Sequence, residues 1–242
     1  MFDLTGKKAL VTGSTQGIGF AIAKTLAAYG ATVYVNGAAS IEKCRAASQK
    51  IPNSIPLLAD LAGKAGIESL YAASGEVDIL VLNASVQQKS DWQTVTAEEF
   101  DNQMVCNARN SFLLMQTYAP HMKRQGWGRI LTIGSINQYR QHPQLAAYAA
   151  SKSAQFNIVQ NMARQLAPFG VTVNNLSPGV IETPRNREAL ADKAYRKRIE
   201  NSIPCGCPGR AEDCAGAALL LCSDAGRYIT GIDLIVDGGM HL

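Results

Sequence analysis

Short apolar runs alternate with longer amphipathic segments along the whole chain. Each run holds five or six residues and is bounded by Gly, Asn, Asp or Ser. Strands that are buried on both faces of a parallel sheet have this composition. Neither face contacts solvent, so polar residues do not alternate with apolar ones along the strand. The runs are K-A-L-V-T (8–12), T-V-Y-V-N (32–36), I-P-L-L-A-D (55–60), D-I-L-V-L-N (78–83), R-I-L-T-I-G (129–134), V-T-V-N-N-L (171–176) and D-L-I-V-D (233–237).

The segments between the runs have the spacing of helices. After the first run, Ile18, Ile22 and Leu26 recur at helical spacing, and Gly30 stands where a helix C-terminus favours glycine. Similar helices are expected at 96–125, 147–168 and 211–223, and shorter ones after the second and third runs. The expected apolar stripe of the helix at 147–168 is Phe156, Val159, Met162 and Leu166.

This alternation has no linker, repeat or low-complexity stretch. It predicts one α/β domain over residues 1–242, a doubly wound parallel sheet of about seven strands with helices on both faces. The segment at about 180–205 is the exception, because it is rich in charge and follows a Pro-Gly turn. We expect it to leave the sheet and to form a lid over a substrate.

The formal net charge is +4, and the segment from Arg185 to Arg198 accounts for all of it, with six basic and two acidic residues. A nucleic-acid binder is normally more basic than this. Two interpretations of the basic segment remain open: a solvated helix in a mobile loop, or a lid that attracts an anionic ligand.

The N-terminal segment lacks the apolar core of a secretory signal, and no apolar run is long enough to span a bilayer. We therefore expect a cytoplasmic protein without a membrane partner, whose six cysteines are reduced thiols. Cys205-Gly206-Cys207 with Cys214 and Cys222 matches no structural zinc pattern, so no metal is expected.

The first apolar run leads into T-G-S-T-Q-G-I-G, which places Gly13, Gly17 and Gly19 at a strand-to-helix turn. Glycine there permits close approach of a diphosphate, whose charge is favoured by free N–H groups and by the helix dipole. The position in the first βαβ unit predicts a dinucleotide site. A purely structural tight turn is the alternative.

Residues 148–152 read Y-A-A-S-K, which puts a tyrosine and a lysine on one face of a helix. Their spacing alone does not distinguish a reactive pair from an ordinary pair on a solvated helix face.

The pattern G-x-x-x-G-x-G followed by Y-A-A-S-K resembles the short-chain dehydrogenase/reductase family, whose fold is of the Rossmann type. The resemblance covers nearly the whole chain. It includes Asp60, Asn83-Ala84, Asn107, Ser135, Val173-Asn174, Pro178-Gly179, Thr183 and the closing Y-I-T-G and V-D-G-G.

The resemblance implies four catalytic residues. Tyr148 is the implied acid/base, Lys152 its activator, Ser135 the group that polarises the carbonyl, and Asn107 an organiser of backbone and water. Lowering a tyrosine pKa from about 10 to about 7 requires about 4 kcal/mol of preference for the phenolate. A desolvated ammonium one helical turn away and an oxidised nicotinamide can supply that preference.

The resemblance also implies a nicotinamide cofactor, with Asp60 and Leu61 at the adenine and Thr183 at the nicotinamide amide. A helix N-cap is the alternative for Asp60. Ser85 departs from the family, which usually has glycine there. The implied cofactor contacts are Gly13, Thr15, Gln16, Gly17, Ile18, Gly19, Asn36, Asp60, Leu61, Asn83, Ala84, Tyr148, Lys152, Pro178, Gly179, Ile181 and Thr183.

The choice between NAD and NADP depends on the end of the second strand. A carboxylate there binds the ribose hydroxyls of NAD, whereas a nearby arginine binds the 2′-phosphate of NADP. The chain reads N-G-A-A-S (36–40), with neither charge, and has Gln16 where phosphate-binding relatives often place arginine. We expect NADP, or acceptance of both cofactors.

We expect a small or medium-sized alcohol or carbonyl substrate, such as a polyol, sugar or hydroxy acid, because the insert 136–145 lines the mouth with polar groups. Arg185 and Arg187 are expected to attract an anionic group. A surface loop position is the alternative for His142. The substrate contacts expected are Ser135, Gln138, His142, Tyr148 and Arg185.

Two rival functions remain. One is reduction of 3-oxoacyl groups on acyl carrier protein, against which Phe169 counts, because carrier-reading relatives tend to have a basic residue there. The other is an idle nicotinamide-binding sensor or scaffold, against which the intact Ser135, Tyr148 and Lys152 argue. The family resemblance also implies a homotetramer or homodimer, paired through the fourth and fifth long helices and sometimes through the C-terminal strand.

Overall fold

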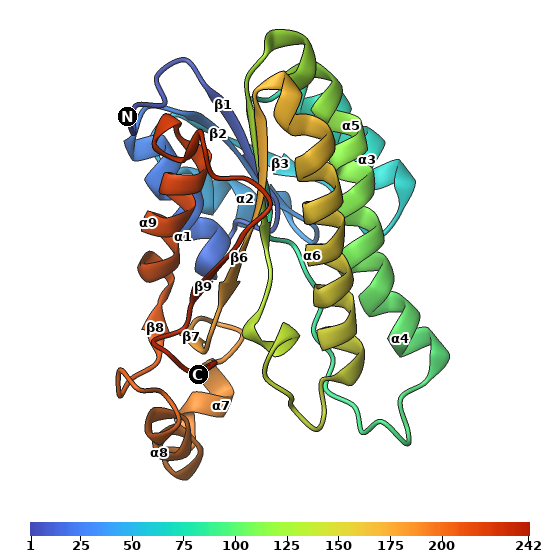
Figure 1. Cartoon of the computed structure of the whole chain (residues 1–242), viewed down its shortest axis with the longest axis vertical. Coiled ribbons are helices and arrows are strands. Elements are labelled where there is room, and N and C mark those ends of the chain that lie inside the picture. The colour runs from blue at the N-terminus through green and yellow to red at the C-terminus, as the bar shows by residue number, and fades with distance from the viewer.

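A computed structural model describes residues 1–242, and its centre is a sheet of seven parallel strands (Figure 1). The strand order is β3-β2-β1-β4-β5-β6-β9, so the sequence-based prediction of a doubly wound parallel sheet is confirmed. None of the helices combines the length and the apolar character that crossing a bilayer requires. The strands are β1 (Lys8–Val11), β2 (Thr32–Gly37), β3 (Ser54–Leu58), β4 (Ile79–Leu82), β5 (Gly128–Ile133), β6 (Val171–Pro178) and β9 (Asp233–Val236).

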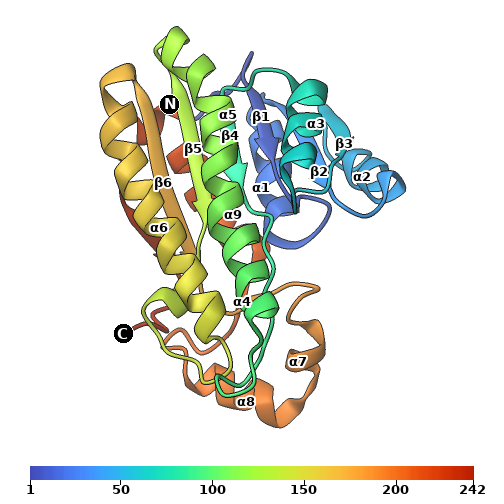
Figure 2. The same cartoon turned by 90° about the vertical axis from the view of Figure 1, so that its right-hand side faces the viewer.

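Helices cover both faces of the sheet (Figures 1 and 2). Two separate apolar cores form there, because successive side chains of a strand point to opposite faces. On β1, Ala9 and Val11 enter the core under α1 and α9, whereas Leu10 enters the core under α5 and α6. One face holds α1 (Gly17–Ala28), α2 (Ile41–Ser48) and α9 (Ala211–Cys222), and the other holds α3 (Lys64–Ser74), α5 (Asn110–Gln125) and α6 (Ala146–Leu166).

The single helix expected at 96–125 is interrupted. It consists of α4 (Ala97–Met104), a π-helical turn over Val105–Arg109, and α5. The turn is closed by the N–H of Asn110, which donates to the Val105 carbonyl. Asn107 lies in this turn and is fully buried, so the irregularity directs its side chain inward.

The segment at 180–205 leaves the main sheet and projects beyond the carboxyl ends of the strands (Figures 1 and 2). Its end is held by Ile203, which packs in a small apolar cluster with Ile136 and Met240. The elements are β7 (Ile181–Glu182), α7 (Arg187–Ala191) and α8 (Lys193–Asn201), and β7 pairs with β8 (Gly209–Arg210).

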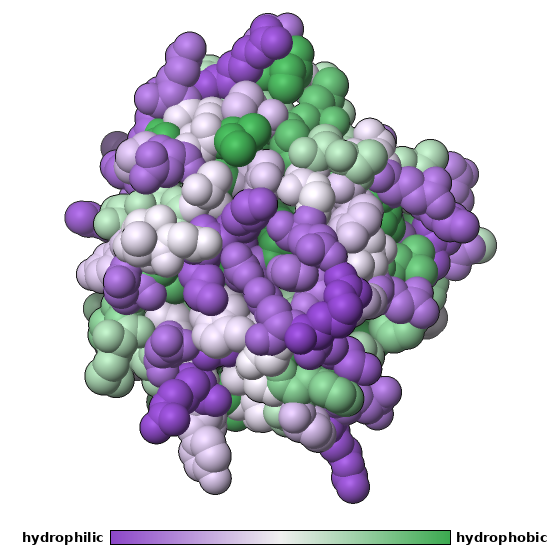
Figure 3. Space-filling model, turned by 90° about the horizontal axis from the view of Figure 1, so that it is seen from above, coloured by the Kyte–Doolittle hydropathy of each residue, from purple (hydrophilic) through white to green (hydrophobic).

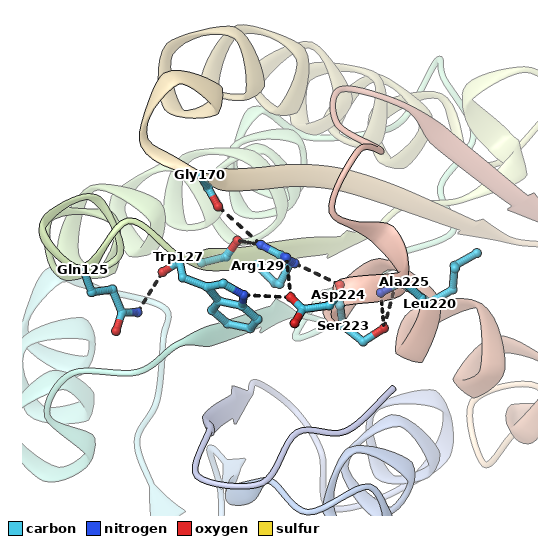
Figure 4. A network of polar contacts seen from close by, with 9 residues as sticks. Gln125, Trp127, Arg129, Gly170, Leu220, Ser223, Asp224 and Ala225 are labelled. Carbon is cyan, nitrogen blue, oxygen red and sulfur yellow. Dashed lines mark hydrogen bonds and ion pairs between the residues drawn. The ribbon is translucent and has the colours of Figure 1, made fainter. Parts of the chain in front are cut away.

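A buried arginine stabilises the opposite edge of the sheet (Figure 4). Arg129, at the start of β5, donates to the Ser223 carbonyl at 3.1 Å and pairs with Asp224 at 3.1 Å. The Trp127 indole N–H donates to the same carboxylate at 2.9 Å. The network ties the end of α9 to the sheet, at the end opposite the segment 180–205. The surface at this end carries only scattered small hydrophobic patches (Figure 3).

Candidate active site

A cleft with a volume of about 540 Å³ lies at the carboxyl ends of the strands. Its walls come from the glycine turn after β1, the loops after β4, β5 and β6, and the segment at 180–205. The order β2-β1-β4 makes the edge between β1 and β4 the point where the chain reverses its direction of winding. Ligands of open α/β sheets bind at such a switch point.

The glycine turn is built for close contacts at this edge. Gly13 and Gly17 have φ values of +61° and +60°, which favour glycine. A Cβ on Gly19 would lie 2.8 Å from the Gly13 carbonyl oxygen and closer still to the Asn83 amide. Asn83 Nδ2 donates to the carbonyls of Thr12 and Gly13, both at 2.9 Å, and so joins the turn to the end of β4.

The amino end of α1 leaves its first N–H groups free for a ligand. No side chain caps it, and its first turn carries no acidic residue. These features fit a diphosphate, because the free N–H groups and the helix dipole both favour negative charge. Thr183 faces this turn across the cleft, 3.5 Å from the position that a Cβ on Gly17 would take.

Ser135 and Tyr148 both line the cleft and are nearly buried. Ser135 follows β5, and its Oγ accepts hydrogen bonds from the Asn137 backbone N–H at 3.2 Å and Nδ2 at 3.1 Å. Burial raises the pKa of Tyr148, and the Arg185 charge and a hydrogen bond with Ser135 oppose that rise.

Lys152 lies beneath the cleft wall, with its Nζ 5.8 Å from the centre of the Tyr148 ring. Nζ donates to the Ile133 carbonyl at 2.7 Å and to Gln155 Oε1 at 3.1 Å. Burial, and to a lesser extent the Arg185 charge, lowers the pKa of Lys152 to about 7. Burial thus disfavours both ionised forms, and the Arg185 charge favours the Tyr148 phenolate. The activation of Tyr148 by Lys152 stays a prediction.

Residues 13–241 match a family model described as enoyl-(acyl carrier protein) reductase. The 3-oxoacyl-(acyl-carrier-protein) reductase of Escherichia coli (strain K12) is 39% identical, with 99% of both chains covered. Gluconate 5-dehydrogenase of Gluconobacter oxydans (strain 621H) is 32% identical, covering 99% of this chain and 96% of the relative. The chain belongs to the short-chain dehydrogenase/reductase family. It is thus one of that family's NAD(P)-dependent oxidoreductases.

A solved structure of the same family has the same fold throughout. Gluconate 5-dehydrogenase from Burkholderia cenocepacia J2315, in complex with NADP and tartrate, superposes with a TM-score of 0.91 at 32% identity. The match covers 99% of this chain and 96% of that one.

The expected cofactor contacts of this dehydrogenase/reductase fall into two groups. The cleft lining includes Gly13, Gln16, Gly17, Ile18, Asn83, Tyr148, Pro178, Gly179, Ile181 and Thr183. Outside that lining lie Thr15, Gly19, Asn36, Asp60, Leu61, Ala84 and Lys152.

Two of the outer residues have structural partners of their own. Asn36 Oδ1 accepts from the Gly13 N–H at 3.3 Å, and its Nδ2 donates to the Ala59 carbonyl at 3.2 Å. Asp60 Oδ1 accepts from the Ala62 N–H at 3.1 Å. The N-cap of α3 is Gly63, so the helix-cap alternative for Asp60 is wrong.

The cleft is lined by positive charge. Lys89, Arg140, Arg185 and Arg198 lie on its wall with His142, and no Asp or Glu does. Burial lowers the pKa of His142, and the charges of Lys89 and Arg140 lower it further, which fits a cationic cluster at the mouth.

Arg185, from the segment at 180–205, reaches across the cleft to the loop after β4. Its guanidinium donates to the Ser85 carbonyl at 2.9 Å and to Ser85 Oγ at 3.2 Å. Ser85 thus has a role that the sequence did not predict, at the position where the family usually has glycine. Arg187 does not line the cleft, because it begins α7 and is exposed there. The expectation that it attracts the ligand together with Arg185 needs this correction.

Gln138 also differs from its predicted place. Its Nε2 donates to Asp233 Oδ2 at 3.0 Å and to Ser177 Oγ at 3.2 Å, so the side chain points into a buried polar cluster. It does not line the cleft, whereas Asn137 does. The substrate contact expected at Gln138 is therefore not supported.

Gln155 and Ser111 are buried polar residues at the site that the sequence did not predict. A signal for Gln155 exists, because it lies three residues after Lys152 and four before Val159, on the same helical face. Of the stripe expected on α6, Val159 and Leu166 are buried on this face, whereas Phe156 and Met162 are only partly buried. The buried positions are Ala147, Tyr148, Ser151, Lys152, Gln155, Val159, Ala163 and Leu166.

Proposed function

We propose that this enzyme interconverts a small hydroxy acid of the sugar-acid type and its keto acid. The observation that carries the proposal is the cleft lining, which holds four cationic side chains and no carboxylate. Unit charges 4 Å apart near a protein surface attract by about 4 kcal/mol. An anionic substrate is therefore favoured over a neutral sugar of the same size. The relatives named gluconate 5-dehydrogenase agree with this class.

We assign Tyr148 as the general acid/base of the reaction. Its Oη takes the hydroxyl proton in oxidation and returns it in reduction. Ser135 Oγ donates a hydrogen bond to the substrate oxygen as negative charge builds up on it. Arg185 holds the substrate carboxylate and also favours the phenolate of Tyr148. A bound nicotinamide cofactor would supply the hydride transfer.

Asn107 and Lys152 organise the site from behind its wall. Asn107 Oδ1 accepts from the Val86 N–H and its Nδ2 donates to the Val86 carbonyl, both at 2.9 Å. This pair of bonds holds the loop that follows β4. Lys152 uses two N–H groups inside the protein, which leaves its third for the cofactor ribose.

We propose NADP as the cofactor that the enzyme accepts best. No acidic residue ends β2, and Asn36 there is bonded to backbone groups, so the end of this strand does not repel a 2′-phosphate. The relative from Burkholderia cenocepacia was crystallised with NADP. A hundredfold preference for NAD in steady-state rates would contradict this choice.

Reduction of 3-oxoacyl groups is the second candidate, favoured by the 39% identical relative. The absorbance at 340 nm, followed with gluconate, tartrate, sorbitol and a 3-oxoacyl thioester, distinguishes the two. Turnover of the hydroxy acids is expected to exceed that of sorbitol and the thioester. Preferred turnover of the thioester supports the second candidate. No turnover of any compound, with cofactor still bound, supports an idle sensor.

Arg185→Gln is expected to raise KM for hydroxy acids by about 10–100-fold, since a charge-assisted hydrogen bond contributes about 1.5–3 kcal/mol. The KM for a neutral polyol should stay within about twofold, because a neutral substrate lacks the carboxylate. Arg187→Gln is the matched control, an exposed arginine outside the cleft. Equal effects on acidic and neutral substrates would show that Arg185 acts only by holding the lid on Ser85.

We also propose that the enzyme assembles through α5 and α6 as a homodimer or homotetramer. Phe112 on α5 is 37% exposed, and Leu113 and Phe156 are only partly buried, which leaves apolar surface on these helices. Light scattering is expected to give two or four times the chain mass of 25.9 kDa. A monomer at micromolar concentration would exclude the proposal.

A further inference from the structure

A continuous chain of buried hydrogen bonds joins Lys152 to Asn107. Lys152 Nζ donates to Gln155 Oε1 at 3.1 Å, and Gln155 Nε2 donates to Ser111 Oγ at 2.7 Å. Ser111 Oγ in turn donates to the Asn107 carbonyl at 2.8 Å. None of the four residues is more than 4% exposed. The chain crosses from α6 to α5 and ends in the π-helical turn.

The direction of every bond in this chain follows from its end. The Asn107 carbonyl can only accept, so Ser111 must donate to it and must accept from Gln155. The Gln155 amide therefore turns its N–H groups to Ser111 and its oxygen to Lys152. The order of donors and acceptors in the network thus determines the orientation of the Gln155 amide.

A second branch returns from Asn107 to α6. Asn107 Nδ2 donates to Ser151 Oγ at 2.9 Å, and Ser151 Oγ donates to the Tyr148 carbonyl at 2.7 Å. The two branches connect the π-helical turn to α6 at both Tyr148 and Lys152. A buried donor or acceptor left without its partner costs about 1–3 kcal/mol, so the network resists partial rupture.

We propose that Gln155 is a positioning residue: its amide oxygen holds the Lys152 amine beside Tyr148, and Ser111 anchors that amide to Asn107. The proposal rests on the proposed catalytic role of Lys152. Nζ would otherwise have only the Ile133 carbonyl as a protein acceptor. Gln155 thus fixes the direction of the third N–H of an ammonium. The ionisable groups that act on Lys152 are Tyr148 on its own helix and Arg185 from the lid.

The amide oxygen also favours the charged form of Lys152, because it accepts a stronger hydrogen bond from the ammonium than from the neutral amine. Its removal should lower the lysine pKa further. If activity needs the ammonium, the variant should lose activity at a lower pH than the wild type on the alkaline limb of the pH profile. This shift is a signature that a merely structural glutamine does not produce.

The test compares Gln155→Leu, of similar size without the acceptor, with Gln155→Glu, which keeps an acceptor and adds negative charge. With gluconate and NADP, Gln155→Leu is expected to lower kcat about tenfold with KM for gluconate unchanged. The alkaline limb of the kcat–pH profile of Gln155→Leu should move to lower pH by about one unit. Gln155→Glu should move the limb back to at least the wild-type position. Binding of NADPH, followed by intrinsic fluorescence, should weaken several-fold in Gln155→Leu only.

Gln165→Leu on the same helix is the matched control, because its amide bonds only to the exposed Asn161 carbonyl. It should leave kcat and the pH profile unchanged. If Gln155→Leu does not fold, Gln155→Glu and Ser111→Ala carry the same test, with a smaller shift to lower pH expected for Ser111→Ala.

An unchanged pH profile in Gln155→Leu, or an equal loss at every pH that Gln155→Glu does not restore, would overturn the proposal. The proposed function would still stand in that case. The function itself fails if Lys152→Met and Tyr148→Phe turn over substrate like the wild type, which is a distinguishable result.

Discussion

Tyr148→Phe is expected to lower kcat by about 10²–10⁴-fold, the contribution of a positioned general acid/base. The substitution removes only the phenolic oxygen, so packing of the nearly buried ring should be preserved. KM for the hydroxy acid should change little, because Arg185 rather than the phenol holds the carboxylate. Steady-state rates at 340 nm in both directions, with the circular dichroism spectrum as a test of folding, measure the effect.

Tyr139→Phe is the matched control for this prediction. The Tyr139 phenol lies outside the cleft and donates to Asp233 at 2.7 Å. Burial, with the neighbouring Asp233, raises its pKa to about 12, so a perturbed pKa alone does not make a tyrosine catalytic. Its kcat should stay within about twofold of the wild type. A Tyr148→Phe enzyme as active as this control would remove the assignment of the acid/base.

Lys152→Met is expected to change how stability depends on pH. The pKa of buried Lys152 is lowered from 10.5 to about 7. Between these values the unfolded chain binds more protons than the folded one, so this group makes the protein more stable as pH rises. Relative to Lys152→Met, the wild type should gain up to about 1.4 kcal/mol of unfolding free energy per pH unit in this window. Urea unfolding at pH 7.5, 8.5 and 9.5 measures it.

Other buried groups do not confuse that comparison. Burial raises the pKa of the Cys214 and Cys222 thiols to about 12, which makes the fold less stable at alkaline pH. Both thiols are present in both proteins, so their contribution cancels in the difference. Lys197→Met, on the exposed side of α8, controls for removal of a surface charge. Parallel stability curves for the wild type and Lys152→Met would show that Lys152 is not desolvated as the structure implies.

Arg185 is the residue through which we expect the segment at 180–205 to act on the proposed chemistry. It is held on Ser85, it lines the cleft, and its charge acts on both Tyr148 and Lys152. A substrate carboxylate that binds Arg185 would partly neutralise that charge. The pKa of Tyr148 should then rise in the substrate complex. The pKa seen in the pH profile of kcat should therefore be higher than the pKa seen in that of kcat/KM.

Several features of the site could be predicted because they depend on short stretches of chain. The seven apolar runs became the seven strands. For the five inner strands the reason is that burial on both faces of a parallel sheet requires continuous apolar sequence. Gly13 and Gly17 were recognisable because their backbone angles favour glycine at those positions. The helical repeat alone placed Tyr148 and Lys152 on one face.

Other features depend on partners that are distant in the sequence. Gln138 turns to Asp233, 95 residues away, and Gln155 bonds to Ser111, 44 residues away. The π-helical turn that buries Asn107 leaves no signal in the apolar periodicity of 96–125. No local pattern contains these pairings, because each exists only once two helices or two loops have packed.

The sequence by itself determined the sheet, the glycine turn and the spacing of Tyr148 and Lys152, because backbone angles and helical periodicity are local properties. Only the tertiary structure decided which charges meet in the cleft and which groups hold Lys152. Electrostatic and hydrogen-bond energies depend on distance and burial in space, and those are set when the elements pack together.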